Sequence, residues 1–151
     1  MADMPKVQTL DDCLRWLDRI DTARSVKSLG TWPMSAVLDH LAQSIEMSMD
    51  GFPQPRSALF QGTAGTAAFR FFKWRRQMTH ALDEPIPGAP ALSAVADWKP
   101  AAIRLRGAVT RFNAHSGALK PHFAYGALDK RDFSLAHGMH IANHQDEIVV
   151  A

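Results

Sequence analysis

The amino-acid sequence predicts an all-α protein, and three observations lead to this fold class. Apolar residues recur three and four positions apart in several segments, as on the buried face of an amphipathic helix. Clusters of glycine and proline separate these segments and mark where the expected helices end. No stretch shows a convincing alternation of apolar and polar residues, the pattern of a strand. We therefore expect one helical domain, residues 1–151, with long proline-rich loops.

The first two expected helices lie on either side of Gly30. Residues 9–24 place apolar side chains at helical spacing, at Leu10, Leu14, Leu17 and Ile20. A second helix begins near Pro33, whose fixed φ suits a first helical turn, and runs to about Asp50. Prolines at positions 53 and 55 then prevent the helix from continuing.

Three further helical segments are expected. One begins after Gly65 and carries Phe69, Phe72, Met78 and Leu82. The next, residues 101–116, places Ile103, Val109 and Phe112 among arginines. The last starts near Asp129 and runs to the end of the chain. Between positions 83 and 100 four prolines exclude continuous helix, so this stretch either covers a pocket or simply connects antiparallel helices.

Composition excludes several classes of partner. Seventeen lysines and arginines oppose 15 acidic residues, so the net charge of +2 gives no general attraction to nucleic acid or anionic lipid. A basic helix face at Arg70, Lys73, Arg75 and Arg76 is better explained as solvated surface, and we do not expect a nucleic-acid partner. No segment approaches the roughly 20 apolar residues of a membrane-spanning helix. Cys13, the only cysteine, is expected to pack in the core, and we expect a soluble, cytoplasmic protein.

Histidines gather on the expected core face of the last helix. His137, His140 and His144 fall within one sector at about 100° per residue. Buried imidazoles are costly unless hydrogen bonds or a metal ion satisfy their nitrogens. The spacing of four between His140 and His144 allows both to bind one ion, whereas His137 and His144 lie too far apart along the axis. A further ligand must come from another helix, and His40 is the best candidate because it lies beside Val37 and Leu41.

Several segments resemble the DinB/YfiT-like superfamily of metal-binding proteins, and specifically a bacterial subgroup classed as a domain of unknown function. These segments are WPMSAVLDH at 32–40, LAQSIEMSMDGFP at 41–53, EPIPGAP at 84–90, PHFAYG at 121–126 and AHGMHIANHQDEI at 136–148. The resemblance implies a four-helix bundle, here with an additional short helix. It also implies a divalent ion, usually nickel or zinc, held by His40, His140 and His144.

Two kinds of function are open, of which the resemblance suggests the first. One is a metal-dependent enzyme, either a hydrolase or a transferase acting on a small thiol, whose small-molecule substrate the sequence does not identify. The other is a ligand-binding or structural bundle without metal, whose histidines are satisfied by hydrogen bonds. Superfamily members often dimerise, so a homodimer is also implied. Asn143 before His144 and Gln145-Asp146 after it depart from the common pattern, and no substrate is carried over.

The sequence leaves the roles of two further histidines undecided. His137 could replace a ligand or move a proton, but a hydrogen-bonded core histidine is the better interpretation. His122 either borders the metal pocket or holds its loop by aromatic packing. Four polar residues could support the ligands from outside, namely Asp39, Gln43, Asn143 and Glu147.

Overall fold

The protein is described by a computed structural model that covers residues 5–151. It is mainly α-helical and contains one small two-stranded sheet. The order along the chain is α1 (Leu10–Thr22), β1 (Val26–Ser28), α2 (Met34–Asp50), α3 (Ala58–Phe60), a π-helical turn η1 (Gln61–Gly65), α4 (Thr66–Arg75), α5 (Lys99–Ala114), α6 (Lys130–Gln145) and β2 (Ile148–Val150). None of these helices is long and apolar enough to cross a membrane.

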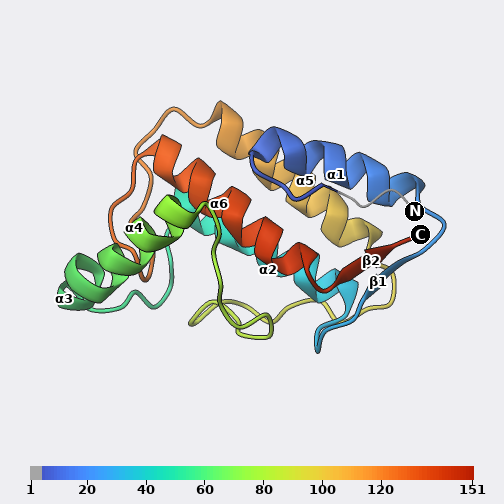
Figure 1. The fold of residues 1–151 in the computed structure, drawn as a ribbon, viewed down its shortest axis with the longest axis horizontal. Helices are drawn as coiled ribbons and strands as arrows, with labels where there is room; N and C mark the ends of the chain where they lie inside the picture. The colour runs from blue at the N-terminus through green and yellow to red at the C-terminus, as the bar shows by residue number, and fades with distance from the viewer. Residues whose placement is uncertain (1–4) are drawn as a thin grey trace.

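The long helices α1, α2, α5 and α6 enclose the main hydrophobic core (Figure 1). The most extensive helix contact joins α2 to α5, and α6 packs against both α1 and α2. Fully buried side chains at the centre include Leu38, Leu105, Phe112 and Phe133. Cys13 also belongs to this core, and burial raises the pKa of its thiol to about 12, so the expectation that it packs as an apolar residue is confirmed.

Local sequence signals explain the helix ends. Thr9 caps α1 by accepting from the Asp12 backbone N–H at 3.1 Å, and the Asp12 carboxylate accepts from the Thr9 backbone in return. Pro33 stands just before α2, and Asp129 caps α6 by accepting from the Asp132 backbone N–H. These ends lie within two residues of the expected ones.

The expectation that the chain contains no strand was wrong. β1 pairs antiparallel with β2, with Val26 opposite Val150 and Ser28 opposite Ile148. Each strand has only three residues, which is too short to show alternation. Ile148 also continued the helical spacing of the histidines, and for this reason the last helix was expected to run to the end of the chain. It instead ends at Gln145.

The helix around positions 66–82 also differs from the expectation. It begins before Gly65, at Ala58, and passes through η1 into α4. It ends at Arg75, because Arg76 adopts a left-handed conformation with φ of 55°. In α5, Ile103 is 72% exposed and Leu105 occupies the core instead. Helical spacing that includes Ile103 therefore does not identify the buried face of α5.

Two glycines in the middle of long helices offer a matched test of packing. A Cβ at Gly138 on α6 would lie 2.7 Å from the Gln8 carbonyl oxygen, whereas a Cβ at Gly107 on α5 would meet nothing within 4 Å. We expect Gly138→Ala to lower the free energy of unfolding by about 1–3 kcal/mol, because backbone must shift. Gly107→Ala should raise it by up to about 1 kcal/mol through helix propensity. Urea unfolding of both variants measures the difference, and a stabilising Gly138→Ala would contradict the close contact.

Candidate metal centre

Three imidazoles from two helices meet near the C-terminal half of α6. His40 comes from α2, and His140 and His144 from successive turns of α6. One nitrogen of each lies within 4.8 Å of the others. The structure therefore brings together the three histidines that the sequence singled out.

The three imidazole nitrogens are close enough to share one ion. His40 Nε2 and His140 Nε2 are 3.0 Å apart. Two nitrogens bound to one tetrahedral zinc ion, each at 2.0–2.1 Å, would lie about 3.4 Å apart. His144 Nε2 is buried without a hydrogen-bond partner among the described residues. A buried nitrogen lone pair without a partner is costly, and a cation would satisfy it.

Burial keeps these imidazoles neutral, the state that metal binding requires. It lowers the pKa of His40 to about 4 and that of His144 to about 3, with nearby histidines adding to both shifts. Burial and the neighbouring histidines also lower the pKa of His140 well below its usual value. At neutral pH all three side chains therefore offer a lone pair.

Glu147 fixes the orientation of His144. Its Oε1 lies 3.3 Å from His144 Nδ1, so Nδ1 donates the hydrogen bond and Nε2 faces the other ligands. The small sheet holds Glu147 in place, since the Leu29 backbone N–H donates to the Glu147 carbonyl at 2.7 Å. A Cβ at Gly30 would overlap the Glu147 carboxylate, so an alanine there would displace this carboxylate. Of the four supporting residues suggested by the sequence, Glu147 is the one that contacts a ligand.

The other three residues suggested as supports form hydrogen bonds with the segment between α4 and α5. The Gln43 amide donates to the Pro90 carbonyl, and Asp39 accepts from the Ser93 backbone N–H. Both contacts hold the segment between α4 and α5 against α2. The Asn143 amide donates to the His80 carbonyl at 3.4 Å and ties the same segment to α6.

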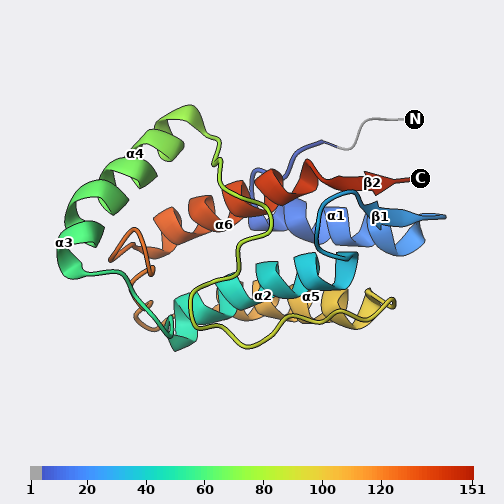
Figure 2. The ribbon, with the colours of Figure 1, turned by 90° about the horizontal axis from the view of Figure 1, so that it is seen from below.

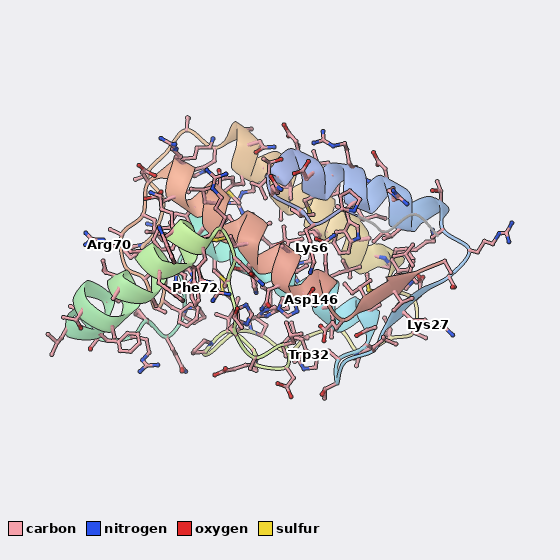
Figure 3. All side chains as sticks on the ribbon, in the orientation of Figure 1. Lys6, Lys27, Trp32, Arg70, Phe72 and Asp146 are labelled. Atoms are coloured by element: carbon pink, nitrogen blue, oxygen red, sulfur yellow. The ribbon has the colours of Figure 1, made fainter. Side chains whose placement is uncertain are left out.

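Trp32 covers the centre from the side of β1. Its ring lies edge-on to His40, with centroids 5.1 Å apart, and parallel to His144 at 6.3 Å. In Figure 3 Trp32 is labelled below Asp146, the residue that follows α6. This indole closes one approach to the imidazoles.

A cleft of about 210 Å³ opens on another side of the centre. His40 and His140 line its floor, and the loop 122–125 and the segment 84–87 line its walls. Gly65 allows this loop to approach η1, because a Cβ there would overlap the Ala124 carbonyl oxygen. Residues 84–87 of the proline-rich stretch therefore border a pocket, one of the two alternatives considered for it, and the rest of the stretch continues to α5 (Figure 2).

His122 and His137 do not join the three ligands. His137 is fully buried between Phe112 and Phe133, and its Nε2 donates to Ser48 Oγ at 3.1 Å, since the Ser48 hydroxyl itself donates to the Ile45 carbonyl. It is thus a hydrogen-bonded core histidine, as the sequence favoured.

His122 fulfils both roles considered for it. It stacks on Tyr125 at 4.2 Å, and its Nδ1 accepts from the backbone N–H groups of Ala124 and Tyr125. Because Nδ1 is an acceptor, the neutral ring carries its proton on Nε2. His122 therefore both holds its loop and lines the cleft.

Sequence reasoning missed His80. It lies in the segment after α4, lines the cleft, and its ring centroid is 5.0 Å from that of His140 and 5.5 Å from that of His144. No helical spacing connects position 80 to the other histidines, so periodicity could not find it. The only available signal was its place directly before the ALDEPIPGAP segment.

The buried His137 should give the protein a measurable sensitivity to acid. Burial lowers the pKa of His137 to about 3, against a usual value of 6.5. Below pH 6.5 this imidazole is therefore protonated in the unfolded chain and stays neutral in the folded chain. Stability should fall from pH 6.5 toward pH 3, by up to about 1.4 kcal/mol per pH unit from this residue. His137→Gln, which can still donate to Ser48, should lose that part of the slope in urea unfolding at pH 7, 6, 5 and 4. Equal slopes in both proteins would contradict this assignment.

Comparison with known proteins adds one result to this geometry. A family model described as "Protein of unknown function (DUF1569)" matches residues 4–150. No curated protein and no solved structure matches the chain. Because the match spans almost the whole sequence, the chain belongs to the DUF1569 family of proteins of unknown function.

Proposed function

We propose that this protein is a DinB-like metalloprotein in which His40, His140 and His144 hold one divalent ion, nickel or zinc. The observation that carries the proposal is the convergence of three neutral, buried imidazole nitrogens within 4.8 Å. Imidazole is a ligand that suits both zinc and nickel. The packing of α1, α2, α5 and α6 around one core supports a four-helix bundle of the DinB type.

The cleft beside the three histidines supports an enzyme acting on a small molecule, either a hydrolase or a small-thiol transferase. When bound, the ion would act as a Lewis acid and lower the pKa of a water or thiol. The chain itself supplies the binding surface. Met78, Ile86 and Tyr125 offer apolar contacts, and His122 offers the donor on Nε2. The covering segment 84–87 limits the access of bulk water to the ligands.

One observation favours the alternative, a ligand-binding or structural protein without metal. The contact of 3.0 Å between His40 and His140 is a hydrogen bond if one Nε2 carries a proton, and Glu147 already satisfies one nitrogen of His144. Against it, His144 Nε2 is buried without a partner among the described residues, and a shared ion would satisfy it. Hydrogen bonds alone therefore leave the cluster incomplete.

Metal content tests the proposal directly. Protein purified without a histidine tag should contain about one nickel or zinc ion per chain by mass spectrometry. The double variant His140→Ala/His144→Ala should contain none, while His115→Ala, which removes a histidine outside the cluster, should match the wild type. If the wild type neither retains nor takes up metal, the metalloprotein proposal fails and the ligand-binding alternative stands.

The role of Glu147 allows a second test. Glu147→Gln should weaken zinc binding by about 10–100-fold, because the amide no longer offers a carboxylate to His144 Nδ1. Gly30→Ala should weaken it too, since the added methyl group displaces that carboxylate. Gly62→Ala serves as the control, because its Cβ would meet nothing within 4 Å. Chelator competition measures the affinities, and unchanged binding in Glu147→Gln would remove Glu147 from the site.

A further inference from the structure

His80 lies in the same cluster as the three helical histidines, although it comes from a loop. The ring centroids of His40, His140 and His144 are 4.8–5.0 Å apart, and His80 is 5.0 Å from His140 and 5.5 Å from His144. Four imidazoles bound to one tetrahedral ion would place neighbouring centroids about 5 Å apart, given zinc–nitrogen bonds of 2.0–2.1 Å. The ring of His80 thus lies at about the distance from the two α6 rings that a shared ion would require.

The ring of His80 presents the correct nitrogen. Its Nδ1 is 2.8 Å from the Ala81 carbonyl oxygen, and a carbonyl oxygen can only accept. Nδ1 must therefore carry the proton of the neutral ring, which leaves the lone pair on Nε2. A hydrogen bond from one ring nitrogen to a backbone carbonyl is the usual way in which proteins orient a histidine ligand.

The backbone around His80 is anchored on both sides. Two residues earlier, Met78 is buried against Ala136 and Met139 of α6. Asn143, which directly precedes His144 in α6, donates its side-chain amide hydrogen bond to the carbonyl of His80 itself. In Figure 2 the chain leaving α4 crosses α6 and then follows α2 toward α5. His80 is therefore positioned by contacts with α6.

We propose that His80 is a fourth ligand of this ion, bound through Nε2 from the side of the cleft. This inference rests on the proposed metal site and adds a loop residue to its helical ligands. The three nitrogens that lie within 4.8 Å of one another do not include one from His80, so its ring would have to move toward them to complete the set. A molecule that enters the cleft and binds the ion would then compete with His80, which also lines that cleft.

Cobalt(II) alone is the probe for the test, because its visible spectrum reports the number and type of ligands. Apo wild type, His80→Ala and His115→Ala are titrated with cobalt and, separately, with zinc. We expect His80→Ala to bind both ions at least about tenfold more weakly and to give a changed cobalt spectrum. Added imidazole should restore the wild-type spectrum to His80→Ala, and His115→Ala should behave as wild type.

The outcomes separate this inference from the proposed function. If His80→Ala matches the wild type in affinity and spectrum, while His140→Ala/His144→Ala loses binding, His80 is not a ligand and the three-histidine site stands. If the wild type binds neither ion, both proposals fall. Far-ultraviolet circular dichroism of His80→Ala should match the wild type, because position 80 lies outside every helix. A loss of helix would replace the ligand role with a structural one.

Discussion

The contact between His40 and His140 is the constraint on which the rest of the site depends. It joins α2 to α6 through two imidazole nitrogens 3.0 Å apart, and both rings are largely buried. Burial keeps both rings neutral, and neutral rings need a partner for each nitrogen. Beside them, Glu147 gives one nitrogen of His144 a partner, and Trp32 packs against the rings of His40 and His144. An ion would satisfy the nitrogen that remains on His144.

The second nitrogen of each histidine decides its role. His137 donates to Ser48 and is enclosed by aromatic rings, so it is part of the core. His122 accepts hydrogen bonds from its own loop through Nδ1, so its Nε2–H remains as a donor for the cleft. His144 donates from Nδ1 to the Glu147 carboxylate, and His80 donates from Nδ1 to the Ala81 carbonyl. In each ring Nε2 therefore points away from the group that accepts this hydrogen bond. Burial alone does not distinguish these residues, whereas the hydrogen bonds do.

The sequence predicted the parts of this structure that follow from helical periodicity. The spacing of His140 and His144 placed both on the core face of α6, and the apolar neighbours of His40 turned it toward them. Periodicity carries no information on contacts between loops and helices. Periodicity could not select Glu147 from the four possible supporting residues, because its contact with His144 forms beyond the end of α6 and beside Gly30. It could not find His80 for the same reason, and Ile103 shows that an apolar residue at helical spacing need not be buried.

The division between helices and loops has a chemical consequence. The three proposed ligands stand on α2 and α6, whose positions are fixed by the core. The cleft walls come instead from the loop 122–125 and the segment 84–87, where proline restricts the backbone without helical hydrogen bonds. Substitutions there can change the shape and polarity of the cleft while leaving the core intact. The histidine cluster is thus built into the packing of the helices, whereas the shape of the cleft depends on two loops. The carbonyl groups of His80 and Pro90, on either side of residues 84–87, accept hydrogen bonds from Asn143 of α6 and Gln43 of α2. The helices that carry the clustered histidines therefore also hold the segment that borders the cleft.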